Sequence, residues 1–428
     1  MATGLPSARS LNHAGGGRLG MGPLADRGSS VAVPLQHSAL LQGLLAVADG
    51  LRAALLHRLF PRLGLTGRAL ITQPVLRVAV GGSVGVAFAL LLTWSMPLLL
   101  LAFSPLLLGI PHLLSDIRYL IVQPGYHRRL WLAGPVGLGL LGAAFGLGMR
   151  AGLLSTALTL ILATSPGTRS RWHGVLRRSL GLLIVAGLAV IGWRKDWYWL
   201  DLAMAHAHNF IAVLLLSLWV SSRTRQSSEP HGALTWAPLG LFLLTAVLLA
   251  SGALTARPTG LLALAGDDRL SLDGARWTLA PYLQPDLGTR VVLLFAFAQA
   301  VHYTVWLRLL PDVTRERPTP RSFRASLDAL HRDLGPGLLT IAGVLVVALI
   351  VYACLDVAVA RDHYFRIAMF HGHLELCALA LWWVEGMPSL PLRRRPATIA
   401  ASTEGLAAVG TVQAGSAMHA PSPVDGNS

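Results

Sequence analysis

Charged residues are scarce in this chain of 428 residues. Asp, Glu, Lys and Arg make up 13% of the sequence, whereas hydrophobic residues make up 54%, and the mean hydropathy is +0.57. A soluble protein carries about 25% charged residues. The composition therefore excludes an ordinary soluble globular protein and indicates a polytopic membrane protein.

Cysteine and lysine are also nearly absent. The two cysteines, Cys354 and Cys377, both fall within apolar stretches, so a disulfide framework is not expected. Lys195 is the only lysine, and arginine supplies the rest of the basic charge. That bias, together with abundant Ala, Leu and Gly, indicates a GC-rich bacterial genome. We therefore expect a multi-pass protein of the bacterial inner membrane.

Acidic residues are outnumbered by basic ones, 20 to 35, which gives a formal net charge of +15. In a soluble protein this excess would point to nucleic acid. Here the arginines lie in short loops beside apolar spans, which is the pattern of cytoplasmic loops in membrane proteins. The expected partners are therefore the lipid bilayer and a lipid-soluble small molecule, and no nucleic acid.

The hydropathy pattern predicts an all-α integral membrane bundle of about ten transmembrane helices. The segment 39–62 has apolar residues at helical spacing but includes charged ones, so we expect an amphipathic helix on the membrane surface. Residues 1–38 and 388–428 are predicted to be disordered tails, which leaves 39–387 as the membrane domain. The predicted spans are 75–94, 96–122, 130–149, 151–165, 178–193, 198–221, 234–254, 289–310, 336–358 and 363–385.

Loop charge orients these spans. Every even-numbered span is followed by an arginine-rich loop, from Arg128 and Arg129 after the second span to 393–395 after the tenth. The positive-inside rule then places both termini in the cytoplasm. The loop 255–288 would be external, where it would cap the outer mouth of the bundle.

Four of the predicted spans carry ionisable residues near their middle, where such residues are costly and usually mark a functional site. All four spans run from outside to inside. Helical rise places their histidines roughly 12–24 Å from the outer ends, so that they meet in one layer near mid-membrane. The residues concerned are His112 and Asp116, His206 and His208, His302, and His371, His373 and Glu375.

Helical facing separates the members of each H-x-H pair, because residues two apart point in nearly opposite directions on a helix. Only one histidine of each pair should therefore face the site. Asn209 lies three residues after His206 and favours His206 as the inward one, while Asp201, Met204 and His208 form the competing face.

Two carboxyl groups accompany the histidines. Asp116 follows His112 by one helical turn, and Glu375 follows His371 by the same spacing. They would orient the ligands or manage protons. Arg118 is close enough in sequence to satisfy Asp116, whereas Glu375 has apolar neighbours, so we expect Glu375 to be more tightly linked to the site.

Several imidazoles at one depth favour a metal site, since neutral imidazole binds iron, copper and zinc well. Nearby carboxylates favour non-haem iron over copper(I). The proposed ligands are His112, His206, His302 and His371. Two alternatives stay open at this point: a bis-histidine haem protein that transfers electrons, and a transporter whose histidines and carboxylates bind protons or a metal ion in transit.

Two short segments carry a family resemblance. Residues 109–116, GIPHLLSD, match a G-x-P-H-G-x-x-D pattern except at Leu113. Residues 302–306, HYTVW, match an H-S-x-R-H pattern only at His302, with Trp306 in place of the second histidine. In these segments the chain resembles the Brp/Blh family of membrane-bound beta-carotene cleaving dioxygenases.

This resemblance implies an enzyme in which histidines hold a non-haem iron that cleaves a carotenoid to retinal. It implies His112 and His302 as ligands. Because the second histidine of the late segment is missing, His371 or His206 would have to substitute for it. The resemblance also implies oxidoreductase chemistry with molecular oxygen.

The topology can be tested with reporter fusions. Fusions after Arg225 or Arg395 should report a cytoplasmic location, because these arginines lie in the predicted inner loops. A fusion within 267–276 should report an external location. A cytoplasmic signal from that third fusion would contradict the ten-span arrangement.

Overall fold

The computed structural model describes residues 39–164, 171–227, 234–254, 267–315 and 319–388. The two tails predicted to be disordered lie outside these residues, apart from Pro388. The longer helices in chain order are α1 (Ala39–Leu59), α2 (Gly64–Thr72), α3 (Pro74–Ser95), α4 (Pro97–Asp116), α5 (Leu130–Gly142), α6 (Gly148–Leu162), α7 (Arg171–Lys195), α8 (Trp197–Ser227), α9 (Ala237–Ser251), α10 (Leu272–Leu279), α11 (Pro285–Thr304), α12 (Leu310–Val313), α13 (Phe323–Leu355) and α14 (Val357–Glu385).

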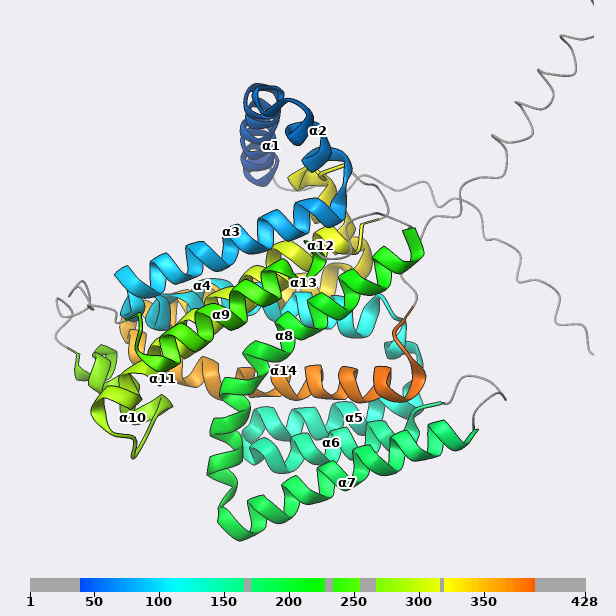
Figure 1. Cartoon of the computed structure of the whole chain (residues 1–428), viewed down its shortest axis with the longest axis vertical. Helices are drawn as coiled ribbons and strands as arrows, with labels where there is room; N and C mark the ends of the chain where they lie inside the picture. Colours follow the sequence, from blue (N-terminus) through cyan, green and yellow to red (C-terminus); the bar gives the residue numbers. More distant parts are fainter. Residues whose placement is uncertain (1–38, 165–170, 228–233, 255–266, 316–318, 389–428) are drawn as a thin grey trace, which may run out of the picture.

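Shorter 3₁₀- and π-helical segments join these helices. They are η1 (Phe60–Leu63), η2 (Ile117–Val122), η3 (Tyr126–Arg128), η4 (Ala143–Leu147), η6 (Leu234–Trp236), η8 (Asp268–Leu270) and η9 (Val305–Leu309). The described part of the chain is 91% helical and has no strand, and ten of its helical segments are long and apolar enough to cross a membrane. The predicted all-α polytopic bundle is therefore confirmed (Figure 1).

One of the ten apolar segments, Leu130–Leu162, is a hairpin of two short helices. The chain reverses at Gly146 and Gly148, whose φ angles of 97° and 49° are accessible to glycine at little cost. Figure 1 shows α5 and α6 side by side. The sequence placed this reversal at residue 150, four residues too late, because hydropathy is uniform across it.

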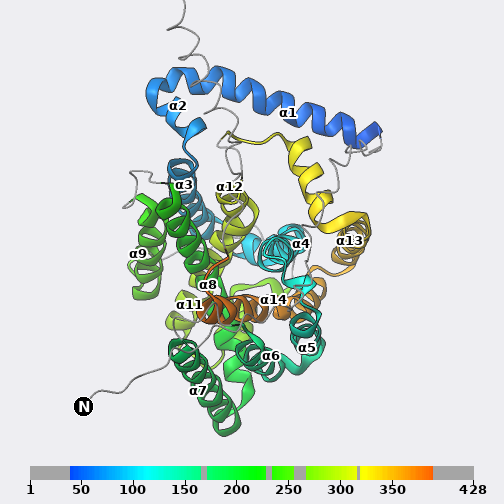
Figure 2. The same cartoon turned by 90° about the vertical axis from the view of Figure 1, so that its right-hand side faces the viewer.

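The helices differ in how deeply they are buried. About two thirds of the most apolar window of α11 and of α14 is buried, compared with 6% for α7 and for α13. Figure 2 accordingly shows α7 and α13 at the margin of the bundle. The exposed Leu, Ile and Val side chains of the outer helices suit contact with lipid. The interior is left to α4, α8, α11 and α14.

Helix α1 lies across the other helices, outside the bundle (Figure 2). None of its most apolar window is buried, and Leu44 and Leu51 are exposed. Its Asp49 accepts hydrogen bonds from the backbone N–H of Phe323, at 2.6 Å, and of Arg324, at 3.3 Å. The carboxylate thus caps the start of α13 and attaches α1 to the bundle, an orientation that agrees with a surface helix.

A buried ionic contact holds α12 in place. The carboxylate of Asp312 is 2% exposed and contacts three guanidinium groups, those of Arg77 at 2.9 Å, Arg308 at 2.8 Å and Arg315 at 2.9 Å. Arg77 also donates to the carbonyls of Leu70 and Ile71 in α2. One carboxylate therefore joins α12 to α3 and, through Arg77, to α2.

The junction between α13 and α14 differs from the prediction. The sequence placed a break at 359–362, but α14 begins at Val357 because Asp356 caps it by accepting from the Val359 N–H at 2.9 Å. That hydrogen bond and the Arg269 guanidinium hold the pKa of Asp356 below its usual value. Arg269 also pairs with Asp267, so the segment before α10 is attached to the start of α14.

Close packing of α5 against α6 gives a stability prediction. A Cβ at Gly139 would collide with the buried Ser155 hydroxyl, whereas a Cβ at Gly137 meets nothing within 4 Å. Gly139→Val should therefore destabilise the protein by about 1–3 kcal/mol through overpacking. The control Gly137→Ala should be neutral or stabilising. Thermal unfolding in detergent measures both, and equal midpoints would contradict the packing described here.

Candidate metal centre

Four helices each place one histidine in the interior of the bundle. His112 lies near the end of α4, His208 on α8, His302 near the end of α11, and His371 on α14. His112 and His302 are 1% exposed. The segments that follow them, η2 and η9, are π-helical. Such segments are rare and occur frequently at functional sites.

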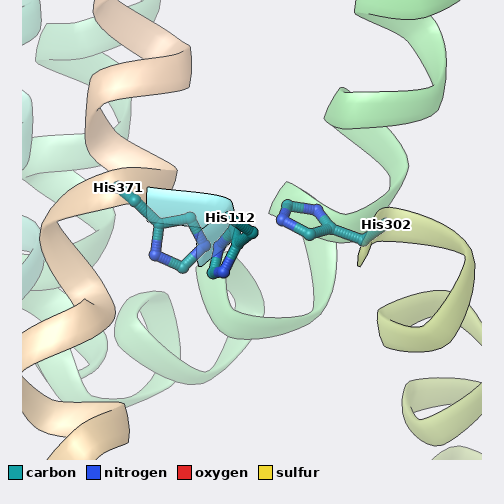
Figure 3. A group of neighbouring side chains, drawn as sticks. All are labelled: His112, His302 and His371. Carbon is teal, nitrogen blue, oxygen red and sulfur yellow. The ribbon is translucent and has the colours of Figure 1, made fainter. Parts of the chain in front are cut away.

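The four imidazoles contact one another. The ring centroid of His112 lies 5.2 Å from that of His302 and 4.7 Å from that of His371. The ring centroid of His208 lies 5.1 Å and 4.9 Å from the same two rings. His112 and His208 therefore both bridge His302 and His371, and Figure 3 shows His112 lying between the other two labelled rings.

Three of these residues have the geometry of a metal site. One ring nitrogen from each of His112, His302 and His371 lies within 4.8 Å of the others. Nitrogens bound to one ion lie at most about 4.2 Å apart, because a metal–nitrogen bond is about 2.1 Å. Small ring rotations would bring all three onto one ion. The structure thus contains a buried group of three histidines that can bind a metal, with His208 adjacent to it.

Backbone contacts orient two of the rings. The Nδ1 of His371 contacts the carbonyl of Ala368, and the Nδ1 of His208 lies 3.1 Å from the carbonyl of Met204. A carbonyl only accepts, so in each case Nδ1 carries the proton and Nε2 is left with its lone pair. This is the arrangement in which an outer partner fixes the tautomer of a metal-ligating histidine.

The other two rings have no such partner. No nitrogen of His112 or of His302 makes a well-aligned hydrogen bond with a described residue, although the His112 ring lies near the backbone of Leu108 and Gly109 and the His302 ring near that of His208; the Nε2 of His371 has no such partner either. A buried polar atom without a partner costs about 1–3 kcal/mol. Five orphaned nitrogens on three touching rings are therefore costly as a packing arrangement, and a bound ion would satisfy one nitrogen on each ring.

The remaining two histidines face elsewhere. His206, which Asn209 favoured as the inward member of its pair, contacts the Leu279 carbonyl through Nε2 at 2.9 Å and packs against Phe295. His208 takes the inward place instead. Helical spacing alone did not show which histidine of the pair faces inward. Asn209 lines the central cavity although His206, three residues before it, contacts α10 instead.

His373 points toward α6. A Cβ at Gly152 would collide with its imidazole, so the absence of a side chain at 152 makes room for the ring. His373 is fully buried, and neither of its nitrogens has a described hydrogen-bond partner. Gly372 makes room in the same way on the side of α14 that faces α8. A Cβ there would lie 3.0 Å from the Met204 side chain and 3.1 Å from that of His208.

The two carboxyl groups are both fully buried beside the histidines. An oxygen of Asp116 lies 3.8 Å from the Nε2 of His112, and neither Asp116 oxygen has a described hydrogen-bond partner. Glu375 accepts a hydrogen bond from the Trp306 indole at 2.9 Å. The Trp306 indole therefore satisfies one oxygen of the Glu375 carboxyl group.

The expectation that Arg118 satisfies Asp116 is wrong. The guanidinium of Arg118 pairs with Asp333 on α13, with its Nε 2.7 Å from the carboxylate. Because η2 is π-helical, the side chains after Ile117 leave the face that an ideal helix would give them. Asp116 is thus the carboxyl group that lies nearest a candidate ligand.

A cavity of about 790 Å³ reaches the four histidines. Helix α10 contributes Thr278 and Leu279 to its wall, and the start of α14 contributes Asp362. The described part of the segment predicted to be an outer loop therefore contributes to the wall of this cavity. The cavity gives a small molecule access to the histidine group.

Tyr364 is a cavity residue that the sequence interpretation missed. Its ring lies where a Cβ of Gly109 would be, so the glycine that begins the GIPHLLSD segment makes room for it. Tyr364 precedes His371 by seven residues, which is two helical turns, and this spacing was the available signal.

Comparisons with family models, with curated proteins and with solved structures found no match for this chain.

The position of Asp116 gives a prediction about metal retention. Asp116→Asn removes the carboxylate beside His112 and should lower metal affinity about 10–100-fold, the usual effect of losing a group that supports a ligand. Glu375→Gln keeps an oxygen that can accept from Trp306 and should lose less. Metal content per protein measures both, and full occupancy in Asp116→Asn would contradict the role given to this residue.

Proposed function

We propose that the protein is a membrane oxygenase in which His112, His302 and His371 hold a non-haem iron, with His208 as an additional ligand. Its substrate is a lipid-soluble molecule such as a carotenoid. The observation that supports this proposal most strongly is the set of touching, buried imidazoles whose nitrogens have no partner within the described residues.

The choice of iron rests on the ligands and their surroundings. Imidazole suits iron, zinc and copper, and carboxyl groups near the imidazoles favour iron over copper(I), which prefers soft sulfur ligands. Asp116 and Glu375 place two buried carboxyl groups near the histidines, where they can offset the charge of a divalent ion. A haem is disfavoured, because rings with centroids 4.7–5.6 Å apart leave no slot for a porphyrin between them.

The resemblance to the Brp/Blh family supplies the reaction. Dioxygenase cleavage adds both atoms of O₂ across one carbon–carbon double bond and gives two carbonyl products, so the atoms balance without an external reductant. When bound, iron would supply the activation of O₂. The protein's own residues hold the ion, orient His371 and His208 through backbone carbonyls, and keep the site among apolar helices.

Access from lipid fits the position of the site. An apolar substrate is already concentrated in the bilayer core, and the cavity reaches the histidines from among the helices. Phe295, Phe365 and Met369 give its wall an apolar character that suits a hydrocarbon chain.

Metal analysis of matched histidine variants tests this proposal. The purified wild-type protein should contain stoichiometric iron without a Soret band. His302→Ala should reduce iron to below about a tenth, because losing one of the four proposed ligands opens the site. His206→Ala is the control, since that ring contacts Leu279 instead, and it should retain iron.

The reaction is tested by incubating iron-loaded protein with beta-carotene and ¹⁸O₂. Label should appear in both carbonyl products. A Soret band, or loss of iron in His206→Ala equal to that in His302→Ala, would contradict the proposed site, and an iron protein that leaves carotenoids intact would contradict the proposed reaction.

A further inference from the structure

The ionic contact of Asp312 leaves positive charge in excess. Its single carboxylate faces three guanidinium groups, those of Arg77, Arg308 and Arg315, so two positive charges are left over. Arg77 also donates to two carbonyl groups at the end of α2. The end of a helix carries only about half of one negative charge. More than one positive charge is therefore uncompensated within this cluster of described residues.

The three arginines differ in exposure. The side chains of Arg77 and Arg315 are 9% and 12% exposed, whereas that of Arg308 is 58% exposed. Two guanidinium groups thus lie inside the protein, and the third lies on its surface. Burying charge without full compensation is costly, because the ion loses its water. An anion that contacts Arg308 is also attracted by the two buried charges, since Coulomb attraction acts without contact.

Arg321 enlarges this basic surface. Burial lowers the pKa of Arg315, and the charge of Asp312 opposes this change. Three guanidinium groups lower the pKa of Arg315 further, and they belong to Arg77, Arg308 and Arg321. Arg321 is therefore close enough to repel Arg315, and its own side chain is only half-buried. The surface thus presents Arg308 and Arg321 to the outside, with two buried arginines behind them.

The neighbouring sequence does not supply the missing negative charge. Residues 308–324 contain five arginines and two acidic residues, which gives a net charge of +3. The opposite end of α11 differs, because residues 267–290 contain four aspartates and three arginines. A positive excess therefore distinguishes one end of α11 from the other.

The basic surface lies beside the helices that suit a membrane interface. Helix α3 packs against both α2 and α12, and Figures 1 and 2 show the three next to one another. Helix α1, which precedes α2, exposes Leu44 and Leu51 outside the bundle. An amphipathic helix of this kind lies at the level of the lipid headgroups. Phospholipid headgroups are thus the anions that lie at the depth of Arg308.

We propose that Arg308 and Arg321 bind the phosphate of an anionic phospholipid in the leaflet that contacts α1 and α2. Their planar guanidinium groups match the geometry of phosphate oxygens. The buried charges of Arg77 and Arg315 strengthen the attraction without touching the lipid. A headgroup with net negative charge is preferred to a zwitterionic one, whose ammonium group the same field repels. The lipid site is independent of the proposed metal and reaction.

Lipid titration tests the proposal. Native mass spectrometry counts the lipids bound to delipidated, full-length protein in detergent. Phosphatidylglycerol and phosphatidylcholine with identical acyl chains are titrated separately. Phosphatidylglycerol should bind at least about tenfold more tightly, and high ionic strength should reduce this preference because salt screens exposed charges. Equal affinities for the two lipids would overturn the proposal.

Variants locate the preference on the protein. Arg308→Gln and Arg321→Gln should each weaken phosphatidylglycerol binding about fivefold, since one basic residue near an anionic membrane contributes about 1 kcal/mol. Arg308→Lys keeps the charge and should retain most of the affinity. Arg290→Gln is the matched control, because Arg290 lies at the opposite end of α11. If Arg308→Gln does not fold, Arg321→Gln carries the test. An unchanged affinity in Arg321→Gln, or an equal loss in the control, would overturn the assignment.

A soluble phosphate carries the same chemistry, so glycerol 3-phosphate is added as a competitor in large excess. A phospholipid that is also held by its acyl chains should stay bound. Displacement of phosphatidylglycerol by glycerol 3-phosphate would assign the surface to a soluble anion and would overturn the lipid site.

Discussion

The architecture depends on the constraint that polar atoms inside an apolar bundle must find partners within the protein. Four imidazoles and two carboxyl groups are gathered at one level of four helices. The helices meet closely there because three positions lack a side chain. Gly109 accommodates Tyr364, Gly152 accommodates His373, and Gly372 allows α8 to approach α14. The polar centre and the close helix contacts are thus parts of one arrangement.

Much of this arrangement could be predicted from the sequence. An apolar span that carries a histidine is conspicuous by composition alone, and the order of the basic loops aligned the four spans in one direction. Convergence of His112, His302 and His371 followed from helical rise, and the structure brings them together. Hydropathy was enough to predict an all-α fold, because each membrane span must form its backbone hydrogen bonds within itself.

The details that the sequence predicted wrongly depend on tertiary contacts. Uniform hydropathy concealed the reversal at Gly146, which is set by backbone φ angles and by Asp201 capping Met149 at 2.6 Å. The choice between His206 and His208 depends on the position of α10, whose Leu279 carbonyl takes the ring of His206. The sequence of α8 contains no pattern that predicts α10 or its contact with His206. Arg118 similarly pairs with Asp333, a residue distant in sequence.

The π-helical segment η9, which follows His302, joins α11 to α12 and gives these two helices different phases. A π turn holds about one residue more than an α turn, and one residue corresponds to about 100° of rotation. Before η9, α11 aims His302 at the site, and after it α12 aims Asp312 at Arg77. Deleting one residue within 305–309 would restore a continuous α-helix and turn one of these two faces away. The extra residue thus allows His302 to face the histidine group while Asp312 faces Arg77.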